Sequence, residues 1–193
     1  MPAKRETQSD MSGAFAERIP DNVLLEPIDY IFADHCRQAD LCEAIKTFAA
    51  DYDTAKPDRE TAQAILHCLN TDLPLHIADE EQDLFPRLRA RALPEDHVAE
   101  LLRLLDREHE RDKCIAKDVR ADIQRLAQGK ALPDVAAFRR AAATLATMHL
   151  SHLNWENAVI LPLARKRLSR EDLKTIGQAM AARRSIPYPQ SET

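Results

Sequence analysis

Glycine is nearly absent from this chain of 193 residues, which contains only Gly13, Gly129 and Gly177. Phosphate-binding loops, dinucleotide-binding turns and tight β-hairpins need glycine, because their backbones adopt positive φ angles that other residues resist. Aromatic residues make up only 5% of the chain, and β-branched runs are short. The sequence therefore argues against those folds and predicts an all-α protein.

The charged and apolar residues exclude two classes of partner. The chain has 27 basic and 32 acidic residues, a net charge of −5, so it lacks the basic field that binds nucleic acid. No stretch reaches about 18 consecutive apolar residues, and the N-terminal segment lacks the apolar core of a signal peptide. We therefore expect no membrane partner and a cytoplasmic location, where the four cysteines stay thiols.

Prolines divide the chain into long segments, because proline is tolerated in the first turn of a helix but not in its interior. The predicted helices cover residues 27–50, 58–90, 94–128 and 133–168, followed by a short fifth helix from Ser169 to Arg184. Pro74 and Pro86 should kink or end the second helix, and Pro162 should kink the fourth.

The four long predicted helices are amphipathic and joined by short connections. This pattern predicts an antiparallel up-down-up-down four-helix bundle, to which the short fifth helix is added. At about 150 residues per domain, the length predicts a single domain. We place it at residues 23–185, between an N-terminal extension of residues 1–22 and a C-terminal tail of residues 186–193.

One motif, His-x3-Glu-x5-Pro, occurs twice. It comprises His76, Glu80 and Pro86 in the second helix, and His152, Glu156 and Pro162 in the fourth. Composition alone predicts only about 0.03 occurrences. Side chains four residues apart lie on one face of a helix, so each histidine and its glutamate can reach a single metal centre.

Both motifs interrupt an otherwise apolar helix face that is predicted to point into the bundle. His35 interrupts the corresponding face of the first helix, and His109 that of the third. A single histidine in such a position is more often a hydrogen-bonded core residue than a ligand. Four in matching positions, together with two carboxylates, would be costly to bury without a partner. A pair of metal ions would remove that cost.

This arrangement resembles the hemerythrin-like, HHE cation-binding domain family over about residues 27–168. The resemblance implies a non-haem centre of two iron ions, joined by an oxo or hydroxo bridge, with terminal histidines and bridging glutamates. The ligands it implies are His35, His76, Glu80, His109, His152 and Glu156.

One position departs from the oxygen-carrying hemerythrins. Their third helix supplies a histidine four residues after the first, whereas Lys113 stands four residues after His109 here. The remaining set is closer to the di-iron domain of bacterial repair-of-iron-centres proteins, although their cysteine-containing N-terminal module has no counterpart here. Fewer protein ligands leave more metal positions open. The resemblance therefore favours binding of, or reaction with, O2, NO or peroxide in a sensor, scavenger or oxidoreductase.

Several alternatives stay open from the residues alone. Histidine and carboxylate ligands also suit manganese and zinc. The protein could store, deliver or sense iron without catalysis, or it could be a metal-free helical interaction module; a homodimer is compatible with each. His149, one turn before His152, is the substitute ligand in the fourth helix, and Glu81 is expected to be solvated or to support a ligand.

Overall fold

The computed structural model describes residues 15–52 and 58–190, except for the side chains of Asp106, His109 and Asp112. The outer parts of the predicted extension and tail, residues 1–14 and 191–193, lie outside the described residues. Within the described residues all regular elements are helices, which confirms the all-α prediction. None of the described helices is both long and apolar enough to cross a membrane.

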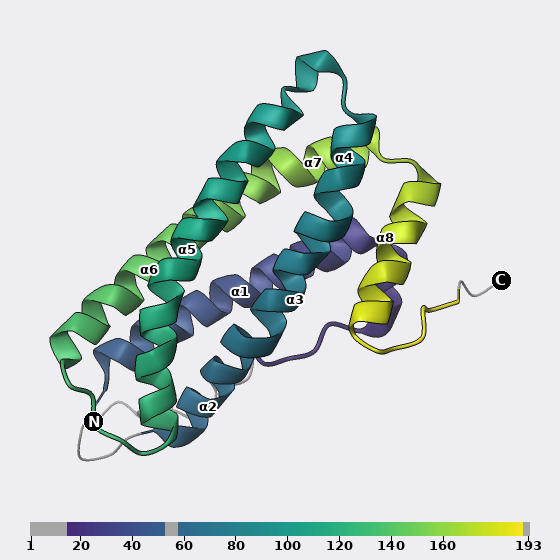
Figure 1. The fold of residues 1–193 in the computed structure, drawn as a ribbon. Helices are drawn as coiled ribbons and strands as arrows, with labels where there is room; N and C mark the ends of the chain where they lie inside the picture. Colours follow the sequence, from purple (N-terminus) through teal and green to yellow (C-terminus); the bar gives the residue numbers. More distant parts are fainter. Residues whose placement is uncertain (1–14, 53–57, 191–193) are drawn as a thin grey trace, which may run out of the picture.

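Helices of three types follow one another along the chain (Figure 1). The 3-10 and π-helical elements carry the letter η. In chain order the elements are η2 (Asp21–Leu25), α1 (Pro27–Ala50), α2 (Arg59–His67), η3 (Cys68–Asp72), α3 (Leu73–Ala78), η4 (Asp79–Leu84), α4 (Phe85–Arg91), η5 (Pro94–Asp96), α5 (Val98–Ala127), α6 (Val135–Trp155), η6 (Glu156–Ile160), α7 (Leu161–Arg167) and α8 (Arg170–Arg183).

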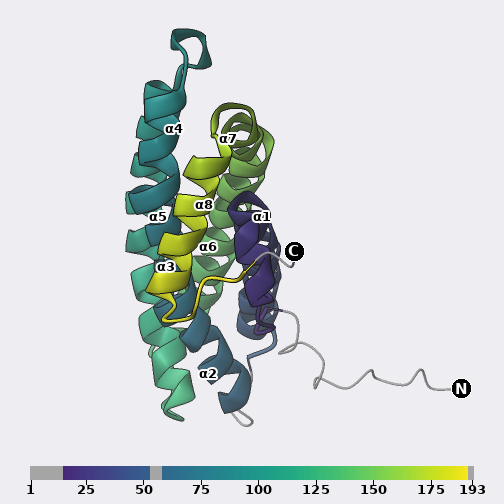
Figure 2. The same cartoon turned by 90° about the vertical axis from the view of Figure 1, so that its right-hand side faces the viewer.

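The long helices lie side by side (Figure 1). Helix α1 packs along α6, and α5 packs against both α2 and α6. The elements from α2 to α4 form one continuous helical run, as do those from α6 to α7. Helix α8 folds back and packs against η2, α1 and η4, where Figure 2 shows it in front of the long helices. Counting α1 and α5 as the first and third helical runs, α2–α4 is the second run and α6–α7 is the fourth. The second and fourth runs each contain one copy of the repeated motif.

Local sequence signals explain where several helices begin. Pro27 occupies the first turn of α1, where its missing N–H group costs nothing. Asp58 caps α2 by accepting a hydrogen bond from the Thr61 N–H, and Asp134 caps α6 through the Ala137 N–H. Ser169 begins α8 with a capping box, in which its side chain and that of Asp172 bond each other's backbone N–H.

The third long helix begins later than predicted from Pro94. Residues Pro94–Asp96 form a separate 3-10 turn, and His97 then adopts a left-handed conformation with φ of 51°, so α5 begins at Val98. Its end matches the prediction closely. Gly129 has φ of 72°, a conformation that glycine adopts without steric cost, and the Lys130 N–H donates to the Arg125 carbonyl.

The interior prolines do not end the helices that contain them. A π-helical turn precedes each one: η3 before Pro74, η4 before Pro86 and η6 before Pro162. Proline lacks an N–H, and its ring clashes with the carbonyl four residues earlier, so a regular α-helical turn cannot form there. The wider π turn lets the residue before the proline bond a carbonyl five residues back.

The buried polar residues divide the apolar core into two clusters. One cluster surrounds α4, α7 and α8, and the other surrounds α2 and the later part of α1. On three helical runs, the residues that flank the polar positions belong to different clusters: Ile31 and Leu41 on α1, Leu69 and Leu84 on the second run, and Leu145 and Ile160 on the fourth. The polar positions therefore meet at one level inside the molecule.

Candidate metal centre

The π turns place the two glutamates of the repeated motif. The Phe85 N–H bonds the Glu80 carbonyl, and the Leu161 N–H bonds the Glu156 carbonyl, each across five residues. The proline of the motif follows directly in both runs, so the same residue that prevents an α-helical turn fixes the backbone of the glutamate. The π turn before Pro74 holds no predicted ligand, so such a turn also precedes a proline where the motif is absent.

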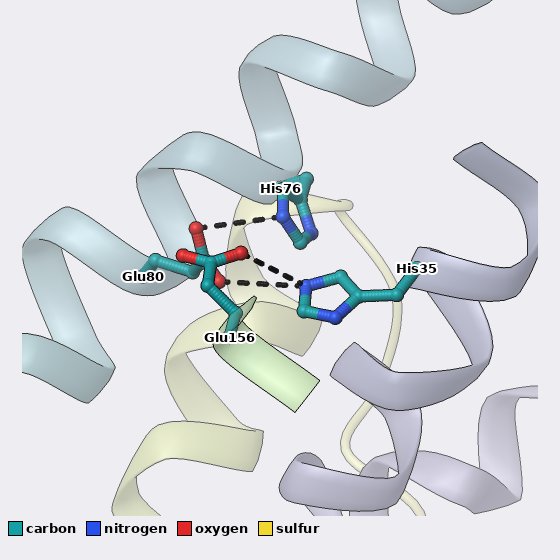
Figure 3. Close-up of side chains that lie close together, drawn as sticks. All are labelled: His35, His76, Glu80 and Glu156. Carbon is teal, nitrogen blue, oxygen red and sulfur yellow. Dashed lines mark ion pairs between the residues drawn. The ribbon is translucent and has the colours of Figure 1, made fainter. Parts of the chain in front are cut away.

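Four of the predicted ligands converge at one point (Figure 3). The ligand atoms of His35, His76, Glu80 and Glu156 all lie within 4.8 Å of one another. His35 Nε2 lies 3.6 Å from an oxygen of each glutamate, and His76 Nε2 lies 3.4 Å from Glu80 Oε2. All four residues are at most 2% exposed, so bulk water does not screen their charges.

His152 joins this cluster through the second glutamate. Its Nε2 lies 3.2 Å from Glu156 Oε2, and the residue is 4% exposed. Each glutamate therefore has two neighbouring imidazoles: His35 and His76 at Glu80, and His35 and His152 at Glu156. Each carboxylate can therefore share a bound cation with a neighbouring imidazole.

The other nitrogen of each imidazole faces an oxygen acceptor. His35 Nδ1 lies 2.6 Å from Asn157 Oδ1, His76 Nδ1 lies 3.1 Å from Asp34 Oδ2, and His152 Nδ1 lies 3.1 Å from Glu108 Oε2. An acceptor at Nδ1 keeps the proton of a neutral imidazole there and directs the Nε2 lone pair toward the glutamates. This is the arrangement that orients histidines toward a bound metal in proteins.

The excess of carboxylates attracts protons to the metal-free cluster. Burial alone lowers the pKa of His76, but the negative charge of Glu80 and the contact with Asp34 outweigh burial and raise the pKa to about 10. Burial likewise lowers the pKa of His152, but Glu156 and Glu108 outweigh it and raise that pKa to about 9. The same field attracts any cation, and a metal ion would displace these protons on binding.

Buried atoms without hydrogen bonds support the same conclusion. Within the described part of the chain, neither His35 Nε2 nor either carboxylate oxygen of Glu156 makes a hydrogen bond. Leaving buried polar atoms without hydrogen bonds is costly. A cation coordinated by these atoms would remove the cost, so the side chains present fit a divalent metal with nitrogen and carboxylate ligands.

The side chain of His109, the remaining predicted ligand, lies outside the described residues. Its backbone is in α5, between Leu105 of one core cluster and Ala116 of the other. Lys113, four residues later, is exposed and forms ion pairs with Glu110 at 2.8 Å and Glu81 at 3.9 Å. The role of His109 as a ligand stays a prediction.

His149 does not lie in the cluster of ligand atoms. Its Nε2 is 2.7 Å from Gln38 Oε1, and the Gln38 amide donates to Asp34, the acceptor of His76. His149 therefore supports the centre through a chain of hydrogen bonds. The side chain of Glu81 is 37% exposed and contacts Lys113, so it lies on the solvent side of its helix.

The supporting residues Asp34, Glu108 and Asn157 were not among the predicted site residues. Each orients a histidine on another helical run, and all three directly adjoin a predicted ligand in the sequence. No spacing within one helix indicates such a contact, because it depends on how neighbouring helices are rotated against each other.

Helix α8 adds a clamp beside the centre. Asp79, the residue before Glu80, is 1% exposed and forms ion pairs with Arg183 and Arg184; the Arg184 contact is 2.5 Å. Arg183 also reaches Asp83 at 2.6 Å. Both ends of η4 are thereby tied to α8, which restrains the segment that carries Glu80.

The helical scaffold and this buried set of imidazoles and carboxylates define a class of protein that binds a cation in its core. Comparison with protein families agrees: residues 26–164 match the hemerythrin HHE cation binding domain. The chain belongs to this family. No curated protein and no solved structure gave a match. Helix α8 and the two arginines of the clamp lie after the matched residues, whereas Asp79 and Asp83 lie within them.

Proposed function

We propose that the chain is a non-haem di-iron protein that binds or reacts with O2, NO or peroxide. Its family and its buried histidine–glutamate cluster support cation binding. The observation that carries the step to two metal ions is the position of Glu80 and Glu156, each of which lies between two imidazoles. In this proposal the helical runs form the up-down-up-down bundle, with α8 as an addition to it.

The proposed ligand set divides into bridging and terminal residues. Glu80 and Glu156 would hold both ions, because each offers two carboxylate oxygens to a point surrounded by imidazole nitrogens. The terminal ligands are His35, His76, His109 and His152, of which the first two and His152 turn Nε2 toward the carboxylates. Iron, manganese and zinc accept this donor set, and the family resemblance favours iron.

Bound iron would supply one-electron chemistry and coordination positions for a small ligand. The chain supplies the surroundings. Asp34, Glu108 and Asn157 hold the imidazoles in place, and the two apolar clusters lie on either side of them. Because Lys113 stands at the position of a possible further histidine, the set would be one ligand short, and bound iron would have a position open to O2, NO or peroxide.

Elemental analysis and absorption spectroscopy test the metal part of this proposal. Protein from iron-supplemented cells should contain about two iron ions per chain and show the near-ultraviolet bands of a coupled ferric pair. Less than about one iron per chain without those bands would refute it. Reconstitution with iron, manganese or zinc identifies the metal that restores thermal stability most strongly.

Stopped-flow mixing tests the reactivity. Reduced, iron-loaded protein is mixed with O2, NO or peroxide, and the absorption is followed. A spectral change with at least one of them, lost in His76→Ala, supports the proposal. An iron-loaded protein inert toward all three would refute the reactivity and leave iron storage, delivery or sensing as the function.

A further inference from the structure

A cavity of about 230 Å³ adjoins the candidate metal centre between α1, α3, α5 and α6. Its inner wall includes the buried histidines His76 and His152, and its outer wall includes the exposed residues Pro74 and Lys113. The cavity therefore extends from the centre to the surface. Most of the rest of its wall is aliphatic, as at Leu145, so its occupant needs a hydrocarbon part.

The cavity wall also contains a half-buried cationic group, that of Arg120. The guanidinium of Arg120 donates from Nη2 to the Leu69 carbonyl at 2.9 Å, but its Nε is buried and makes no hydrogen bond within the described residues. No carboxylate in that part of the chain forms an ion pair with it. A half-buried guanidinium with a buried, unbonded N–H and no counter-charge can still gain a partner, and the best one is a carboxylate, which accepts from two N–H groups at once.

The second cation at the cavity differs in this respect. Lys113 already forms ion pairs with Glu110 and Glu81 and is exposed. An anionic ligand therefore gains more binding free energy at Arg120 than at Lys113.

Size limits the hydrocarbon part. An apolar cavity of about 150 Å³ holds benzene, with six heavy atoms, so 230 Å³ corresponds to about nine. The helical rise of 1.5 Å per residue separates Leu69, the level of Arg120, from His76 by about 10 Å. Seven carbon–carbon bonds in an extended chain span about 9 Å. A straight-chain acid of eight carbons satisfies both limits.

We propose that this cavity binds a medium-chain aliphatic monocarboxylate, with its carboxylate on Arg120 and its chain end against His76 and His152. This site goes beyond the proposed function. Only the nearness of the chain end to a bound metal rests on that function.

Isothermal titration calorimetry of the full-length, iron-loaded protein with octanoate tests the proposal. Wild-type protein should bind one octanoate per chain, and 1-octanol, which has the same chain without the charge, should bind at least tenfold more weakly. Arg120→Gln should weaken octanoate binding at least tenfold. The matched control is Arg103→Gln on the same helix: Arg103 also donates to a backbone carbonyl, that of Ala99, but does not line the cavity.

Filling the cavity is an independent test. Leu145→Trp should abolish octanoate binding, and Ala116→Leu, a smaller change in the same wall, covers the case in which the tryptophan variant does not fold. Circular dichroism establishes which variants are folded. No saturable binding by wild-type protein, equal binding by Arg120→Gln and Arg103→Gln, or unchanged binding by a folded cavity-filling variant would each overturn the proposal.

Iron is measured in the same samples to separate this site from the proposed function. Octanoate binding by protein that does not take up iron would uphold the cavity site and refute the di-iron function. Iron uptake without octanoate binding would refute the cavity site alone.

Discussion

Substitution of Asp34 tests whether the residues that hydrogen-bond the histidines control metal affinity. It is 4% exposed, and its carboxylate lies 3.1 Å from His76 Nδ1, 3.1 Å from the Gln38 amide and 3.0 Å from the Arg37 guanidinium. Removing such a partner of a metal-binding histidine lowers metal affinity about 10- to 100-fold, or about 1.4–2.7 kcal/mol. We expect Asp34→Ala to reach this range, because no atom of alanine can accept the Nδ1 proton.

Asp34→Asn separates the two contributions of the carboxylate. Asparagine keeps an oxygen at Nδ1 but carries no charge, and the structure already pairs an asparagine oxygen, that of Asn157, with His35. The affinity of this variant should therefore lie between wild type and Asp34→Ala. Asp29→Asn is the matched control on α1, since Asp29 is an exposed aspartate paired with Arg165 at 2.7 Å.

Competition with a chelator of known ferrous affinity, under anaerobic conditions, measures the metal affinity of all four proteins. Thermal unfolding of the metal-free forms identifies any variant that is not folded at the assay temperature. If folded Asp34→Ala retained the affinity of Asp29→Asn, the hydrogen bond to His76 would not orient a ligand, and the argument from the Nδ1 acceptors would be refuted.

Four further predictions follow from the site and its surroundings. Pro162→Ala removes the cause of the π turn at Glu156, so iron per chain should fall, while calorimetry of the metal-free protein should show unchanged or higher stability; full iron content would contradict this. His152→Ala should lose iron and His149→Ala should retain it in elemental analysis; the opposite result would make His149 the ligand. In the metal-free protein, the raised pKa of His76, about 10 against 6.5 when unfolded, gives stability that is complete below about pH 6.5 and lost as pH rises through 10. Urea unfolding at several pH values measures it, and a flat profile over that range would disprove it. Removing iron present at about 100 times its Kd should lower stability by about 2.7 kcal/mol, a fall in Tm of about 5–11 °C, and an unchanged Tm would show that the site does not stabilise the fold.

The features that the sequence determines by itself are local. The capping residues Asp134 and Ser169 and the closing Gly129 act on their own helix ends, so the corresponding boundaries could be predicted closely. The motif that contains Glu80 and Glu156 was equally visible, because residues four apart share a helix face wherever the helix lies. Its proline was recognised too, but as a kink, since only the bonded backbone shows that the turn widens and continues.

Tertiary structure decided everything that depends on two helices at once. Asp34 meets His76, Asn157 meets His35, and His149 turns toward Gln38 although it lies one turn from His152. These pairings follow from the rotation and offset of packed helices, which the burial of two whole apolar clusters sets. Helical periodicity is a property of a single segment, whereas a contact between segments is a property of the packed molecule, and only the former can be found by counting residues.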